Sequence, residues 1–217
     1  MTQNHWNALF NRLVETRPSP RRWRLAASAF MRVLPIAQLR HNQNAIALAE
    51  QFADGQASAH QLASARYLGR FNPVDIAWAL LWSPEQDPIS MMVRAINWAT
   101  SVYQQTSSVS GLPRQPLPYT NPADSAWFEE LADCLLEILG PESQTWPLDE
   151  EVLTWQGRTV EKMAQAIYQT RDFSTMPVLA DALEEAGCTN ESLLQHCRTA
   201  SGHVRGCWVL DGILGKQ

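Results

Sequence analysis

Four short motifs, each an N-cap residue followed by proline, constrain the fold of this chain more than any other feature. They are Ser19-Pro20, Asn72-Pro73, Asp87-Pro88 and Asn121-Pro122. In each pair the polar side chain can accept a hydrogen bond from a free N–H of the first helical turn. Proline at the first helical position supplies a suitable φ without removing a needed donor. The motifs predict four helix starts.

Apolar residues follow each start at helical spacing. After Pro122, they are Trp127, Leu131, Cys134, Leu135 and Ile138, closed by Gly140-Pro141. Similar patterns predict further helices at about 42–53, 58–68, 159–168, 177–186, 190–198 and 203–213. No run of alternating apolar and polar residues is long enough for a strand. The sequence therefore predicts an all-α protein, an irregular multi-helix bundle.

The longest break in the helical pattern is residues 107–121, which contain three prolines and one glycine. A second irregular stretch is expected at 141–156. We expect a single helical domain over 1–217. The alternative is two helical subdomains, 1–106 and 122–217, joined by the Pro-rich loop at 107–121.

The net charge of −5 hides an uneven distribution. Residues 1–70 carry nine arginines and three acids, or +6, whereas residues 71–217 carry eight bases and nineteen acids, or −11. Such a division suggests a charged partner, or two parts of the chain that face each other. Trp23 falls on an apolar helical face and is expected in the core. Its basic neighbours are the candidate partner-binding residues Arg17, Arg21, Arg22 and Arg24.

The compartment follows from what the sequence lacks. No stretch approaches the 18 or more consecutive apolar residues of a membrane span, and the first residues are polar, without the apolar region of a secretory signal. The four cysteines are too few and too unevenly placed for a disulfide framework. We expect a cytoplasmic protein that does not bind membranes.

The C-terminal segment contains the residues best suited to a metal site. Cys188, His196, His203 and Cys207 have the spacing C-x7-H-x6-H-x3-C, and His203 and Cys207 would share one face of a helix. Two cysteines and two histidines can complete a tetrahedral zinc shell, although this spacing matches no standard zinc motif. The alternative is that the cysteines are buried apolar residues and the histidines cap helices or face solvent. A cysteine nucleophile at Cys207, with His203 and Asp211, is disfavoured because Asp211 lies too far along such a helix to orient His203.

Catalytic motifs are missing: the sequence has no P-loop, G-x-G-x-x-G, H-E-x-x-H or G-x-S-x-G. The absence of these motifs, the divided charge and the nine tryptophans favour a non-enzymatic helical domain that interacts with another protein or regulates one. The first alternative is a zinc-binding protein or metalloenzyme that uses the C-terminal Cys/His set. The second is nucleic-acid binding through the Arg-rich N-terminal third.

Residues 179–216, LADALEEAGCTNESLLQHCRTASGHVRGCWVLDGILGK, resemble the C-terminal module of a group of uncharacterised planctomycete-type proteins. Upstream, RLAASAFMRVLP at 24–35 and AIALAEQFADGQAS at 45–58 are similar to the first helices of that group. Members often carry adjacent cysteines in the first of these helices, where this chain has Ser28, Ala29 and Phe30. The resemblance implies one coherent family domain and implies no activity.

Overall fold

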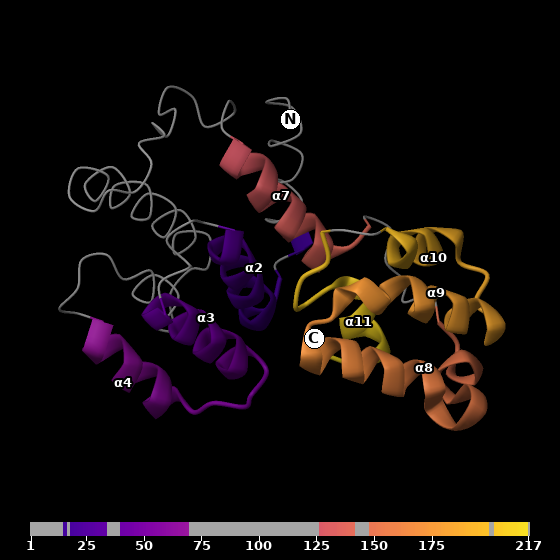
Figure 1. The fold of residues 1–217 in the computed structure, drawn as a ribbon, viewed down its shortest axis with the longest axis horizontal. Coiled ribbons are helices and arrows are strands. Elements are labelled where there is room, and N and C mark those ends of the chain that lie inside the picture. Colours follow the sequence, from indigo (N-terminus) through magenta and orange to yellow (C-terminus); the bar gives the residue numbers. More distant parts are fainter. Residues whose placement is uncertain are drawn as a thin grey trace. The chain divides into compact units, whose positions relative to one another are not determined.

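The computed structural model describes residues 15–16, 18–33, 40–69, 126–141, 148–199 and 202–216. These residues form eight α-helices and a short 3-10 helix and contain no strand, which confirms the all-α prediction (Figure 1). The chain divides into two compact units, Met1–Ala132 and Asp133–Gln217. The helix starts expected after residues 72 and 87 and the loop expected at 107–121 lie outside the described residues.

Among the described residues, none of the helices combines the length and the apolar content that a bilayer crossing requires.

Three helices are described in the first unit: α2 (Pro20–Val33), α3 (Arg40–Ala53) and α4 (Ala59–Gly69) (Figure 1). The expected caps are present at two of them. The N–H of Arg22 donates to Ser19 Oγ at 3.4 Å, and the N–H of Gln61 donates to Ser58 Oγ at 3.2 Å. The Gln61 side chain in turn accepts from the N–H of Ser58 at 2.8 Å, which completes a capping box.

Helices α2 and α3 pack through small and aliphatic side chains and are joined by two ion pairs. Glu50 is buried, and its two carboxylate oxygens each accept a hydrogen bond from Arg32 at 2.9 Å. Arg21 contacts Asp54 at 3.0 Å. Bidentate pairing of this kind satisfies a carboxylate that burial would otherwise destabilise. The buried apolar residues of the two helices include Leu25, Ala26, Ala29, Met31, Ala45, Ile46 and Ala49.

Helix α7 (Ala126–Leu139) crosses the division between the units, so its last residues belong to the second unit. That unit continues with α8 (Glu150–Thr170), the 3-10 helix η3 (Phe173–Thr175), α9 (Met176–Glu185), α10 (Glu191–Arg198) and α11 (Trp208–Ile213). The irregular stretch expected at 141–156 is wrong at residues 150–154, which are helical, whereas Trp155 and Gln156 have non-helical backbone conformations. Glu150 and Glu151 lie in the first turn of α8, where their negative charge stabilises the N-terminus of the helix.

Helix α8 is interrupted where the sequence places its only glycine. Gln156, Gly157 and Arg158 have left-handed backbone conformations, with φ of 42°, 67° and 67°. Such a conformation costs about 1–2 kcal/mol at each residue that carries a Cβ. These residues divide α8 into two helical parts. The helix predicted at 159–168 is the part of α8 that follows this break.

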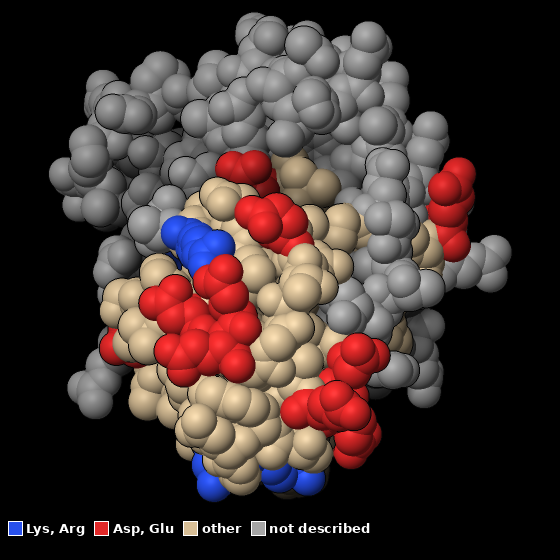
Figure 2. Space-filling model, turned by 90° about the vertical axis from the view of Figure 1, so that its right-hand side faces the viewer, with Lys and Arg blue, Asp and Glu red and all other residues tan. Residues whose placement is uncertain are grey.

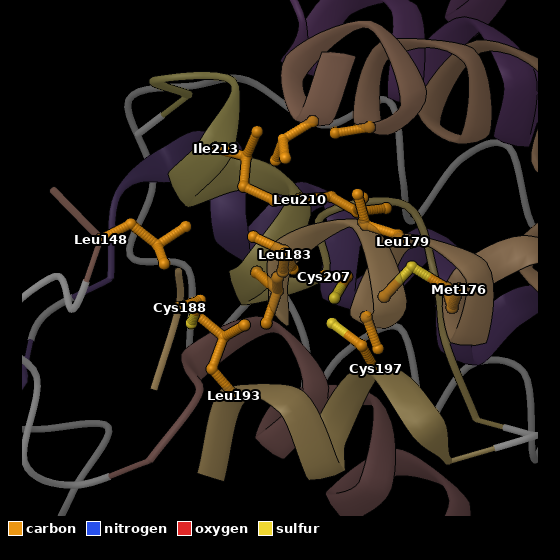
Figure 3. Packing of buried hydrophobic residues seen from close by; sticks show 14 of the residues in the cluster. Leu148, Met176, Leu179, Leu183, Cys188, Leu193, Cys197, Cys207, Leu210 and Ile213 are labelled. Carbon is orange, nitrogen blue, oxygen red and sulfur yellow. The ribbon is translucent and has the colours of Figure 1, made fainter. Parts of the chain in front are cut away.

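The core of the second unit lies between α8, α9, α10 and α11. Side chains from all four helices meet there, and Figure 3 shows Leu179 and Leu183 of α9 pointing into the middle of the cluster. Trp208 and Val209 are buried in the same cluster. Helix α9 ends as the sequence predicts, because Gly187 has a φ of 96° and the N–H of Cys188 donates to the Leu183 carbonyl at 2.9 Å.

Leu183 offers a direct test of this packing. The substitution Leu183→Ala should lower the free energy of unfolding by about 2–5 kcal/mol, because it removes buried atoms and leaves a cavity. Val178→Ala on the same helix is the matched control, since Val178 is 54 % exposed and should lose less than about 0.5 kcal/mol. Denaturant unfolding of both variants measures the difference. Equal losses would show that α9 does not pack through Leu183.

Candidate metal centre

Three segments of the second unit each bring a polar side chain to one place. The first is the end of α7, which supplies Glu137. Its neighbours Leu135, Ile138 and Leu139 are buried, and the Glu137 side chain is only 10 % exposed. The helix stops directly afterwards, where Gly140 has a φ of 72° and its N–H donates to the Leu136 carbonyl at 2.8 Å. This places the carboxylate in the last helical turn.

The second segment is α10, which supplies His196. Asn190 caps the helix by accepting the N–H of Leu193 at 2.9 Å. Leu193, Leu194 and Cys197 form its buried side. His196 lies at the border of that side, with Nε2 at 3.3 Å from Cys207 Sγ and 3.5 Å from Glu137 Oε1.

The third segment, residues 202–207, supplies His203 and Cys207. We expected these residues to be helical, and this prediction is wrong, because α11 begins only at Trp208. Gly206 has a φ of 96°, and the N–H of Cys207 donates to the Val204 carbonyl at 3.0 Å, so the segment is a turn. Cys207 is the N-cap residue of α11. The two side chains therefore converge through a turn and not along a helix face.

Both ring nitrogens of His203 have partners. Nε2 lies 3.0 Å from the Thr199 carbonyl oxygen, and Nδ1 lies 2.8 Å from Glu137 Oε1. A carbonyl oxygen can only accept a hydrogen bond, so the Nε2–H of His203 donates a hydrogen bond to the Thr199 carbonyl. Metal-binding histidines commonly donate the N–H of their other nitrogen to a carbonyl in this way, which fixes the tautomer and the direction of the ring. The arrangement directs Nδ1 toward Glu137.

Glu137, His196, His203 and Cys207 each have a ligand atom in this cluster, and all four atoms lie within 4.8 Å of one another. His196, His203 and Cys207 are thus brought together as the sequence suggested, and Glu137 is an addition. Cys188 is not part of the group. Its backbone closes α9 and its side chain packs beside Leu193, away from Cys207 in the view of Figure 3.

Glu137 was not identified as a ligand from the sequence, because it precedes His203 by 66 positions. Spacing along the chain identifies only ligands that lie near one another in sequence. One signal could have identified Glu137. A negative charge in the last turn of a helix is unfavourable, because the helix C-terminus carries partial negative charge. Glu137 occupies that place and borders the buried residues of α7. An acid in such a position needs another source of stabilisation.

The pKa values of Glu137 and Cys207 are shifted in opposite directions. Burial by itself would raise the pKa of Glu137, but hydrogen bonds from His196 and His203 and the charge of these rings lower the pKa overall. Burial and the nearby Glu137 carboxylate raise the pKa of the Cys207 thiol well above its usual value, although the N–H groups of Leu210 and Val209 act in the opposite direction. Without a metal, the cluster holds a carboxylate and a neutral thiol.

This arrangement argues against cysteine catalysis. A nucleophilic cysteine needs a lowered pKa and access to substrate. Cys207 is fully buried and its pKa is raised. Asp211, which the sequence aligned with His203 and Cys207, is also buried but does not belong to the cluster of ligand atoms.

Two of the arginines expected to bind a partner, Arg21 and Arg24, contact residues of the first unit. Arg21 pairs with Asp54, and Arg24 is 8 % exposed, with its guanidinium 4.9 Å from the centre of the Phe52 ring. Burial lowers the pKa of Arg24. Arg22 is partly buried, and Arg17 lies outside the described residues. Trp23 is buried, as expected.

Acidic side chains of α9 form a surface feature separate from the cluster. Asp181, Glu184 and Glu185 are exposed, and Arg198 of α10 contacts Asp181 at 3.9 Å and Glu184 at 2.5 Å. Figure 2 shows acidic side chains gathered in patches on one face of the molecule, with a basic side chain beside one of them. These carboxylates face solvent and are not members of the group that could hold a metal.

Comparisons of the chain with protein-family models, with curated proteins and with solved structures found no match. The resemblance to planctomycete-type proteins stays a prediction, and the candidate metal centre rests on its geometry.

The pKa values of the buried thiols lead to a test of cysteine reactivity. Burial raises the pKa of Cys197 to about 12 and that of Cys207 well above the usual value. At pH near 8 both residues should hold far less thiolate than an unperturbed cysteine. Iodoacetamide should therefore label them at least about 100-fold more slowly in the native, metal-free protein than in the urea-unfolded chain. Peptide mass spectrometry measures both labelling rates. Fast labelling of Cys207 in the native protein would contradict its burial and would support a role of Cys207 as a nucleophile.

Proposed function

We propose that this protein binds one divalent transition-metal ion, zinc first among them, through Glu137, His196, His203 and Cys207. The observation that carries the proposal is the convergence of these four side chains within 4.8 Å. Glu137 precedes His203 by 66 positions, so proximity along the chain does not explain its place in the group.

Two distances in the cluster are close to those around a tetrahedral ion, and separations toward the 4.8 Å limit would have to shorten. Zinc lies about 2.0–2.1 Å from nitrogen or oxygen and about 2.3 Å from sulfur, so neighbouring ligand atoms are about 3.3–3.7 Å apart. The contacts of His196 with Cys207 and with Glu137, at 3.3 and 3.5 Å, are close to this spacing. The 2.8 Å contact between His203 and Glu137 would have to lengthen. A bound metal ion would be held by both His203 and Glu137.

The charge of the donors supports a divalent ion. Thiolate and carboxylate together carry −2, and two neutral imidazoles add nothing, so an ion of charge +2 leaves the buried centre neutral. A buried net charge is costly, which makes this balance favourable. Mixed nitrogen, oxygen and sulfur donors in a four-coordinate shell are typical of zinc, whereas calcium and magnesium prefer shells of oxygen alone.

The role that fits this centre is structural. Four protein ligands fill a tetrahedral shell and leave no position for water or substrate, unlike catalytic zinc sites, which have three protein ligands. The hydrogen bond from His203 Nε2 to the Thr199 carbonyl fixes the direction of the His203 ring. The proposal therefore agrees with the expectation of a non-enzymatic protein.

Protein interaction is a second candidate function, supported by one surface. Val178 of α9 is 54 % exposed, and the exposed Asp181 and Glu185 follow at spacings that put them on the same side of the helix. An apolar side chain bordered by acids suits a basic amphipathic segment of a protein partner. Nucleic-acid binding gains less support, because Arg21 pairs with Asp54 and Arg24 is buried.

Zinc content tests the proposal. Full-length protein purified without an affinity tag and equilibrated with zinc should hold about one zinc ion per chain. Cys207→Ala and His196→Ala should each weaken zinc binding by more than about 100-fold, because loss of a residue that only hydrogen-bonds a ligand already costs about 10–100-fold. Elemental analysis and competition with a chromogenic chelator measure stoichiometry and affinity. Affinity should also rise with pH, because Cys207 must lose its proton to bind.

Cys188→Ala is the matched control for Cys207→Ala, since both cysteines are buried in the same unit and only Cys207 faces the other three ligands. It should bind zinc as the wild type does. His196→Ala changes a side chain that is 20 % exposed and guards against a simple folding defect in Cys207→Ala. Wild-type protein without zinc, or equal losses in the two cysteine variants, would overturn the assignment.

A further inference from the structure

The four ligands are unevenly distributed along the chain. His196 and Cys207 are 11 positions apart, with His203 between them, whereas Glu137 precedes His203 by 66 positions. Glu137 is also the one ligand that comes from α7. Coordination would therefore bind α7 to a site whose other ligands all lie in one short stretch of chain.

The apolar residues of α7 do not share the core of the second unit. The hydrophobic cluster of that unit begins at Leu148, and neither its buried nor its partly buried members come from α7. Leu135, Ile138 and Leu139 are buried but are not members of that cluster. Glu137 is a polar side chain of α7 that contacts His203 and His196 directly.

We propose that occupancy of the metal site controls how firmly the last two turns of α7, residues 133–139, are held against α10 and residues 202–207. This inference rests on the proposed function and adds a regulatory role to it. With metal bound, the end of α7 is fixed by a coordination bond. Without metal, Glu137 contacts His203 at 2.8 Å and His196 at 3.5 Å, and these contacts do not include a coordination bond.

The size of the effect follows from binding linkage. If detaching α7 breaks the metal site, a ligand that binds only the attached state makes detachment rarer by a factor of 1 + [L]/Kd. With free zinc at a hundred times its Kd, detachment becomes about 100-fold rarer. If three ligands keep some affinity for zinc after Glu137 leaves, the factor is smaller.

Hydrogen–deuterium exchange of the full chain tests the proposal. Amides of residues 136–140 should exchange at least about 10-fold more slowly in saturating zinc than in chelator, since their exchange requires local opening of this helix end. Glu137→Gln should abolish this zinc-dependent protection. Asp133→Asn is the matched control, because it makes the same change at an exposed position of α7 and should keep the protection.

The outcomes separate this inference from the proposed function. If the wild type binds zinc and residues 196–207 become protected while residues 136–140 do not, the metal centre stands and the control of α7 is overturned. Zinc-dependent protection of residues 136–140 that persists in Glu137→Gln would overturn it as well. If the wild type binds no zinc, the proposed function fails first, and this inference fails with it.

Discussion

A carboxylate that is nearly withdrawn from water must find partners, and this constraint connects the polar parts of the second unit. Glu137 is 10 % exposed, lies in the unfavourable last turn of α7, and is met by His203 and His196. Those rings are in turn positioned by the Thr199 carbonyl and by the cap of α10. The neutral thiol of Cys207 completes the group. Three segments are thus related through one buried acid, and a divalent ion would balance the charge of the assembled centre.

Local signals predicted the helices well, because caps and turns involve residues a few positions apart. Ser19-Pro20 begins α2, Ser58 caps α4, and Gly187 ends α9 where expected. The errors arose where local patterns conflicted. Gly206 breaks the helix predicted at 203–213, and the acids at 150 and 151 start α8 inside a stretch that looked irregular.

The candidate site was predictable in part for the same reason. His196, His203 and Cys207 lie within a short stretch, so spacing alone could group them. Cys188 has equally suitable spacing, but its backbone closes α9 and its side chain packs into the core. Glu137 joins the group only through tertiary structure. The uneven charge distribution was also only partly informative. Glu50 and Asp54 are two of the three acids in residues 1–70, and they pair with Arg32 and Arg21 inside the first unit.

X-ray absorption at the zinc edge identifies the atoms that bind the metal ion. Zinc-loaded protein should show one sulfur at about 2.3 Å and three nitrogen or oxygen atoms at about 2.0–2.1 Å, with the scattering pattern of two imidazoles. That shell corresponds to Cys207, His196, His203 and Glu137. A shell with two sulfurs would bring a second cysteine into the site in place of Glu137. A shell of six oxygen or nitrogen atoms without sulfur would show that Cys207 does not bind the ion and would contradict the assigned ligand set.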